Sequence, residues 1–206
     1  QIDLIDTKVE VRLDPLVVHV AGTVTLTFAP IEPALKHLKL DAERLTIDRV
    51  RDREGNELQF DVEERGFSVN FPRPLAPAET TFIRIDYHGE PTMGLYFIPS
   101  VKEDPEKIPM IWSQGEAEEN RFWFPGYDYP NDKATSAVSV TTPRPNVVVS
   151  NGALTGREDN PDGTRTFHWA EKVPNSTYHI ALAVGEFDSA VEYTSRFLRP
   201  PKILVN

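Results

Sequence analysis

The sequence predicts an all-β fold, an antiparallel two-sheet β-sandwich in which residues 1–206 form a single domain. Two segments, residues 7–13 and 18–28, alternate polar and apolar residues, which is the pattern of half-buried strands. The chain contains 18 prolines and 11 glycines, and proline interrupts helices but is tolerated at strand edges and in turns. No segment keeps a helical period for more than a turn or two, so short strands joined by turns account best for the chain.

The N-terminal half is expected to begin with a hairpin, because Asp14 and Pro15 form a turn between the first two strands. Residues 34–45 have a composition that would suit a helix. Leu38 and Leu40 are two residues apart, however, and so are Leu45 and Ile47, a spacing that favours two short strands. Three further strands are expected at residues 57–62, 66–71 and 80–87.

The C-terminal half is expected to add an apolar strand at residues 147–152 and a hairpin that joins residues 155–158 to residues 164–169. A closing strand is expected over residues 178–184. The sequence ends on an apolar, strand-like run before Asn206, after which we expect more chain.

The charge balance excludes some classes of partner. The 22 basic and 32 acidic residues give a net charge of −10, which repels phosphate backbones, so we expect no nucleic-acid partner. The apolar stretches are too short to cross a bilayer, so we expect no membrane segment in this chain. The absence of cysteine excludes disulfides and cysteine-ligated zinc, but it leaves a cytoplasmic or a secreted localisation equally open.

The common catalytic motifs are missing from the sequence. No two of the five histidines have the i, i+4 spacing that binds zinc on one helix face. The patterns G-x-G-x-x-G and G-x-S-x-G and the phosphate loop are also missing. We therefore expect no catalytic residue, metal ligand or cofactor site of a familiar kind in this chain, although a site assembled from distant residues stays open.

Polar and aromatic residues are concentrated in one segment in the middle of the chain, which reads WSQGEAEENRFWFPGYDYPNDK from Trp112 to Lys133. A structural interpretation is that Arg121 pairs with Asp128 and fixes a loop bounded by Pro125 and Pro130. The aromatic run at residues 122–124 is then expected to pack in the core or between domains.

Two chemical interpretations of the same segment stay open beside the structural one. Gln114 and Glu116 both offer oxygen acceptors for an ammonium group, so they could form a pocket for a cation that the aromatic residues shield from water. Alternatively, Glu116 and Glu118 could divide the roles of acid and base, as paired carboxylates do in glycosidases.

Several motifs occur in this chain in a fixed order. Residues 114–121 and 124–135 are similar to the pattern Q-x-E…A-R-x-x-F-P-C-x-D-x-P-x-x-K-A, and residues 94–96, 149–152 and 176–187 are similar to G-x-Y, L-S-N-x-P/G and M-S-T-Y-L…F-A-V-G-D-F. Together they resemble the N-terminal domain of the family M1 zinc aminopeptidases, over most of the chain. The sequence departs from the family at Asn120, where a small or acidic residue is usual, at Gly126, where cysteine is usual, and at His179.

The resemblance implies a saddle-like β-sandwich that is truncated before a zinc metallopeptidase catalytic domain. That domain would bind the zinc through H-E-x-x-H, and neither this motif nor G-x-M-E-N occurs in the chain. By residue match, Glu116 would bind the α-ammonium group of a peptide substrate and Gln114 would line the pocket for its first side chain, and neither would bind metal. The implied partners are a peptide with a free N-terminus and the catalytic domain of the same protein.

Two other functions remain as alternatives. The chain could be an M1-like β-domain that acts as a protein-interaction scaffold. It could also be an unrelated β-sandwich binding module of an adhesion or carbohydrate-binding kind, although the Cys…Trp…Cys spacing of immunoglobulin domains is missing.

Overall fold

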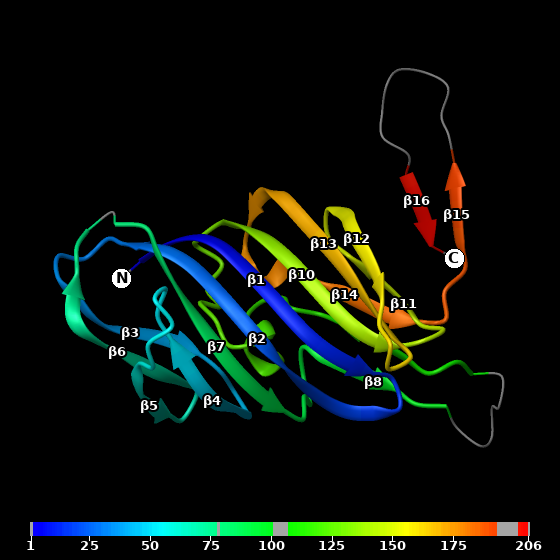
Figure 1. Ribbon diagram of the computed structural model, residues 1–206, viewed down its shortest axis with the longest axis horizontal. Coiled ribbons are helices and arrows are strands. Elements are labelled where there is room, and N and C mark those ends of the chain that lie inside the picture. The colour runs from blue at the N-terminus through cyan, green and yellow to red at the C-terminus, as the bar shows by residue number, and fades with distance from the viewer. Residues whose placement is uncertain (1, 78, 101–106, 193–201, 206) are drawn as a thin grey trace.

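The computed structural model describes residues 2–77, 79–100, 107–192 and 202–205, and it consists almost entirely of β-strands (Figure 1). Helical structure in these residues is limited to two short 3₁₀ helices, η1 (Asn120–Phe122) and η2 (Thr177–His179). The predicted all-β fold is confirmed. Within the described ranges, no helix is long and apolar enough to cross a membrane.

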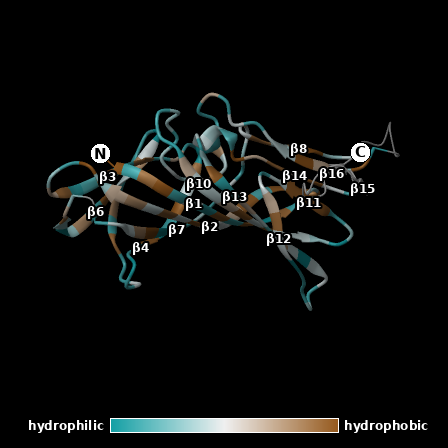
Figure 2. Ribbon diagram, turned by 90° about the horizontal axis from the view of Figure 1, so that it is seen from above, coloured by the Kyte–Doolittle hydropathy of each residue, from teal (hydrophilic) through white to brown (hydrophobic). Residues whose placement is uncertain are grey.

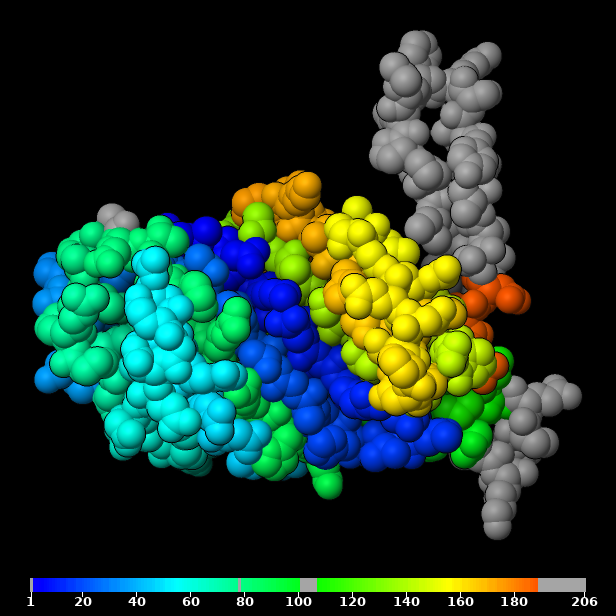
Figure 3. All heavy atoms as spheres, in the orientation of Figure 1, coloured from blue at the N-terminus to red at the C-terminus, as the bar shows by residue number. Residues whose placement is uncertain are grey.

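Seven strands form the largest sheet, in the order β12-β13-β10-β1-β2-β7-β4. Their bounds are β1 (Ile2–Asp14), β2 (Val17–Pro30), β4 (Leu45–Arg51), β7 (Thr81–Gly89), β10 (Ala134–Pro143), β12 (Ala153–Asp159) and β13 (Thr164–Asn175). The hairpin of β1 and β2 is the one that the sequence pattern predicted, and it lies at the centre of the sheet. Figure 3 shows this side of the molecule, with the blue β1 and β2 between the cyan β4 and the yellow β12.

One strand pair in the largest sheet is parallel. Strand β1 lies beside β10 with Asp6 opposite Thr135 and Arg12 opposite Thr141, whereas every other described pair is antiparallel, as predicted. Strand β10 was not predicted. Its buried side includes hydroxyl residues such as Ser136 as well as valines, so the contrast between its two faces is too weak for a pattern of alternating hydropathy to reveal it.

The remaining strands form three smaller sheets. Their members are β11 (Val147–Ser150), β14 (Leu182–Gly185), β9 (Met110–Ser113) and β8 (Leu95–Ile98) in a four-stranded sheet, β3 (Leu35–Asp41), β6 (Gly66–Leu75) and β5 (Gln59–Glu63) in a three-stranded sheet, and the pair β15 (Ser189–Glu192) and β16 (Lys202–Val205). Strands β3 and β4 confirm that residues 34–45 contribute to strands and not to a helix.

The closing strand begins later than predicted, at Leu182 instead of residue 178. Ser176 donates its hydroxyl to the carbonyl of Pro130 at 3.0 Å, and Thr177 donates its hydroxyl to the carbonyl of Tyr127 at 3.0 Å. These two long-range bonds hold the chain in the short helix η2 before the strand starts. Their partners lie about fifty positions earlier, so the local sequence does not reveal them.

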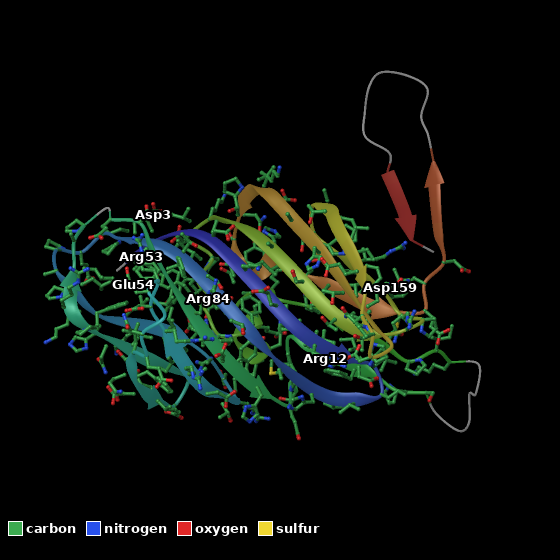
Figure 4. The ribbon with its side chains drawn as sticks, viewed as in Figure 1. Asp3, Arg12, Arg53, Glu54, Arg84 and Asp159 are labelled. Atoms are coloured by element: carbon green, nitrogen blue, oxygen red, sulfur yellow. The ribbon has the colours of Figure 1, made fainter. Side chains whose placement is uncertain are left out.

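A continuous hydrophobic core joins the three larger sheets. The fully buried side chains include Val9 and Leu26 of the seven-stranded sheet, Leu38 and Val69 of the three-stranded sheet, and Ile111 and Val184 of the four-stranded sheet. Figure 2 shows the resulting alternation of brown apolar and teal polar residues along the strands. Charged side chains such as Arg12, Arg84 and Asp159 are spread over β1, β7 and β12 (Figure 4).

Candidate functional site

The connection between β9 and β10, residues 114–133, contacts all three larger sheets and contains the polar groups that the sequence singled out. It continues directly from β9 in the four-stranded sheet. Tyr87 in β7 donates its hydroxyl to the carbonyl of Trp123 at 2.9 Å. Asp41, at the end of β3, and Gly126 exchange two backbone hydrogen bonds of 2.7 and 2.9 Å. The connection is therefore held from three sides.

Gln114 and Glu116 lie in a tight loop at the start of this connection. The backbone N–H of Gln114 donates to the carbonyl of Gly94 at 2.9 Å, and the N–H of Glu119 donates to the carbonyl of Gly115 at 2.9 Å, which closes the loop. The peptide bond that follows Glu116 is cis. Gln114 and Glu116 are both exposed, and in the described part of the chain neither side chain has a hydrogen bond or an ion pair.

The other two glutamates of the loop have partners. Glu118 accepts a hydrogen bond from Nη2 of Arg121 at 2.8 Å. Glu119 accepts one from the hydroxyl of Tyr96 at 3.3 Å. Because the Glu118 carboxylate is paired with a guanidinium, the geometry gives no support to an acid–base pair of Glu116 and Glu118. Glu116 is the glutamate of this loop that keeps a free carboxylate among the described contacts.

Asn120 follows the loop and is completely buried, with 0% exposure. Its Nδ2 donates to the carbonyl of Thr177 at 2.6 Å and to that of Ile180 at 3.3 Å, and its Oδ1 accepts a hydrogen bond from the indole N–H of Trp123 at 2.8 Å. The amide therefore joins the connection to the segment that leads into β14. All its strong hydrogen-bonding groups have partners, as a buried amide requires.

Arg121 lies at the centre of a buried charge cluster. Its guanidinium contacts three carboxylates, with Nη1 3.1 Å from Asp41 Oδ1, Nη2 2.8 Å from Glu118 Oε2 and Nε 3.3 Å from Asp128 Oδ2. Nη2 also donates to the carbonyl of Asp128 at 2.9 Å, and the backbone N–H of Arg121 donates to Asp128 Oδ2 at 3.0 Å. The planar guanidinium suits this arrangement because it offers five donors in a fixed geometry.

Burial raises the pKa of Asp128 from 3.8 to about 6. The hydrogen bonds and positive charge of Arg121 act in the opposite direction, and the negative charge of Asp41 adds to the increase. Asp128 has only 3% of its side chain exposed, so the loss of hydration of the carboxylate outweighs the attraction of a single guanidinium that two other carboxylates share.

The aromatic run at residues 122–124 is confirmed as core. Trp123 and Phe124 are at most 1% exposed and meet edge to face, with 4.5 Å between ring centres. Pro125 is also buried, whereas Pro130 is exposed and accepts the hydroxyl of Ser176 through its carbonyl. The two prolines thus bound the part of the connection that contacts Asp41 and Arg121.

Two hollows flank this connection. One, of about 340 Å³, is lined by Trp112, Ser113, Val149, Ser150, Asn151, Ala181, Leu182 and Ala183. The other, of about 540 Å³, is lined by Lys39, Leu40, Asp41, Glu63, Glu64, Arg65, Gly66, Tyr127 and Tyr129. Among the described residues, no three His, Asp or Glu side chains converge closely enough to hold a metal ion.

The sequence pattern did not reveal three residues that define this region. Asp41 was assigned only to a strand, and Thr177 only to a motif. Asn120 was noted only as a departure from the usual residue. No local signal marks an asparagine as buried, because its partners at residues 177 and 180 are almost sixty positions away.

The comparisons with known proteins identify the family to which this chain is similar. The family model for the peptidase M1 N-terminal domain matches residues 6–179. Leucine aminopeptidase 2 of Yarrowia lipolytica is 29% identical over 190 residues, which are 90% of this chain and 28% of that protein. Aminopeptidase B of Rattus norvegicus is 30% identical over 122 residues, which are 59% of this chain and 18% of that protein.

Solved structures have the same fold. An M1 zinc metallopeptidase from Deinococcus radiodurans matches with a TM-score of 0.80 and 26% identity, over 93% of this chain and 44% of that chain. Yeast LTA4 hydrolase in complex with bestatin matches with a TM-score of 0.76 and 23% identity, over 92% of this chain and 29% of that chain. The chain thus spans less than half of each of these relatives.

Proposed function

Because this chain belongs to the peptidase M1 N-terminal domain family, we propose that it is the non-catalytic β-domain of a zinc aminopeptidase. In this proposal it supports a catalytic domain and directs Glu116 and Gln114 towards the N-terminus of a peptide substrate. Glu116 binds the α-ammonium group, and Gln114 lines the pocket for the first side chain. The free carboxylate of Glu116 on a firmly held loop is the observation that carries the proposal.

The proposed domain organisation follows from the lengths of the relatives. Residues 1–206 form one β-domain, and a zinc metallopeptidase domain follows it. The chain corresponds to 28% of leucine aminopeptidase 2 and to 44% of the Deinococcus metallopeptidase. The remaining part of those proteins is long enough to contain a catalytic domain.

An exposed, unpaired carboxylate suits the recognition of an amine. Glu116 can form a charge-assisted hydrogen bond with an ammonium group without first breaking an ion pair. The loop that carries it is closed by the bond between Glu119 and Gly115, so little backbone freedom is lost when the substrate binds. The side-chain oxygen of Gln114 adds a neutral acceptor two residues away.

The described residues do not fit a zinc site, since no cluster of ligands is present among them. In the proposed enzyme, zinc bound by the catalytic domain would activate a water molecule and polarise the scissile carbonyl. The task of this chain is to bind and orient the substrate by its amine. By itself, the chain is expected to hydrolyse no aminoacyl substrate.

The test is the substitution Glu116→Gln in the parent enzyme. Loss of one charge-assisted hydrogen bond should reduce kcat/KM for peptides with a free N-terminus by about 30-fold, which corresponds to about 2 kcal/mol. The zinc content should not change, because Glu116 is not proposed as a ligand.

Glu64→Gln is the matched control, because Glu64 is also exposed and the substitution changes the net charge equally. It should leave kcat/KM at the wild-type value. Equal kcat/KM in the wild type and in Glu116→Gln would refute the role of Glu116 in substrate binding.

A further inference from the structure

We propose that Asn120 is the positioning residue for Glu116: its buried amide holds the loop that presents the carboxylate, and it thereby sets the affinity for the substrate amine. This inference rests on the proposed function. Asn120 does not touch the substrate itself. Its position next to the loop, its burial and its three hydrogen bonds carry the argument.

Asn120 packs directly against Gly115 of the loop. A Cβ atom added to Gly115 would lie 2.7 Å from Asn120 Oδ1 and 2.5 Å from the carbonyl of Tyr178, distances that real Cβ atoms do not show. The loop backbone therefore lies in van der Waals contact with the amide and with the segment that the amide binds. Asn120 therefore limits the space open to Gly115, whose carbonyl accepts the bond that closes the loop.

The orientation of the amide is fixed by its partners. Nδ2 faces the two carbonyls of Thr177 and Ile180, and Oδ1 faces the indole N–H of Trp123. Trp123 is fully buried, so neither end of the amide can turn to water. The side chain consequently occupies one position in the folded protein, and so does the start of the loop.

The same anchoring leaves Glu116 as the free carboxylate of the loop. Glu118 is drawn to Arg121 on one side and Glu119 to Tyr96 on the other. With the loop closed between Gly115 and Glu119, Glu116 is the glutamate of this loop that has no partner among the described contacts. Release of the loop would let the three glutamates exchange partners, because all three are carboxylates on one short stretch of chain.

Asn120→Asp tests this inference because it changes the hydrogen-bonding groups of the side chain while its size stays almost the same. The carboxylate still accepts from Trp123, but it meets the carbonyls of Thr177 and Ile180 with an acceptor instead of a donor. In the parent enzyme, KM for an aminoacyl-aminocoumarin substrate should rise roughly tenfold, with kcat changed less than about threefold. Asn120→Ala, which removes the whole amide group and adds no acceptor in its place, should also raise KM and serves if the first variant does not fold.

Tyr87→Phe is the matched control, because it removes a buried hydrogen bond to the same connection, at the carbonyl of Trp123, and leaves the amide of Asn120 in place. It should lower thermal stability and leave KM unchanged. Glu116→Gln is combined with each Asn120 variant. If Asn120 acts through Glu116, the KM effect of the double variant should not exceed that of Glu116→Gln by more than about twofold.

Each result decides between the two proposals. A normal KM in both Asn120 variants, with KM raised in Glu116→Gln, would overturn the positioning role and leave the proposed function intact. A normal KM together with a normal kcat/KM in Glu116→Gln would overturn both. The inference would also be refuted if the KM increase in the double variant equalled the product of the two single increases. A KM increase in Tyr87→Phe would refute it as well, because either result would identify Asn120 as a general contributor to stability.

Discussion

Replacement of Arg121 by methionine should destabilise the protein through the carboxylates that it leaves behind. The guanidinium is 6% exposed and its partner Asp128 only 3%, whereas Asp41 is 22% exposed and Glu118 41%. Methionine has a similar length and fills much of the same space, so the change removes charge and hydrogen bonds more than volume.

The size of the loss follows from the burial of each partner. Removal of one member of a buried ion pair costs about 3–5 kcal/mol, because the remaining charge is neither hydrated nor compensated. The half-exposed Glu118 adds at most about 1 kcal/mol, since water screens that contact. The free energy of unfolding of Arg121→Met at pH 8 should therefore lie about 3–5 kcal/mol below that of the wild type.

The loss should depend on pH and on Asp128. Without Arg121, the pKa of Asp128 rises above its value of about 6 in the wild type, because the lowering contributions of Arg121 disappear. At pH 5 the Asp128 carboxyl of the variant is therefore neutral and leaves no unpaired buried charge. The difference in the free energy of unfolding between Arg121→Met and the wild type should then be smaller at pH 5 than at pH 8. For the same reason, the double variant Arg121→Met/Asp128→Asn should recover about 2 kcal/mol of the loss at pH 8.

Urea unfolding at pH 5 and pH 8 of the wild type, the two single variants and the double variant measures these differences. The reasoning would be refuted by a loss below about 1 kcal/mol, the range of an exposed pair. It would equally be refuted by a loss that is the same at both pH values, or by additive effects of the two substitutions.

Two further predictions concern the same connection. The pKa of Asp128 is raised in the folded state from 3.8 to about 6, so between these pH values the folded protein holds a proton that the unfolded chain releases. The free energy of unfolding should therefore fall as the pH rises from about 4 to about 6, by up to about 3 kcal/mol. Urea unfolding across this pH range should show that fall in the wild type and not in Asp128→Asn. If the free energy of unfolding depended on pH in the same way in both proteins, the raised pKa of Asp128 would be contradicted. Gly94 has φ +72° and a Cβ there would lie 2.0 Å from the carbonyl of Glu119, whereas Gly163 has φ +86° and open space around it. Gly94→Ala should therefore lower the thermal midpoint well beyond Gly163→Ala, which carries only the backbone strain of about 1–2 kcal/mol, and equal midpoints would show that the contact at Gly94 relaxes without cost.

The sequence predicted the features that depend on neighbouring residues. The alternation in β1 and β2 and the turn at Asp14 and Pro15 indicated the central hairpin. The spacing of two within the pairs Leu38/Leu40 and Leu45/Ile47 indicated β3 and β4. The order of motifs between residues 94 and 187 indicated the family that the comparisons then established. Strand β10 was not predicted because its hydroxyl residues lie on both faces. Alternating hydropathy is the local signal of a strand's buried side, and it is weak there.

Within the candidate site, the sequence singled out Gln114, Glu116, Arg121 and Asp128 by residue type and motif. Which of the glutamates stays free could not be predicted, because it depends on Tyr96 and Arg121 reaching Glu119 and Glu118. Asn120 could not be recognised either, since its role depends on two carbonyls of a segment almost sixty residues away.

The sequence by itself therefore determined the class of the fold, most of its strands and the segment that contains the site. These properties can be predicted from patterns of about ten residues or fewer, because side-chain alternation and turn preference depend on residues close together in the chain. Only the tertiary structure decided that β10 lies parallel to β1, that three carboxylates converge on Arg121 and that the buried amide of Asn120 binds the carbonyl of Thr177. Each of these depends on groups that are far apart along the chain and meet only when the sheets pack around one core.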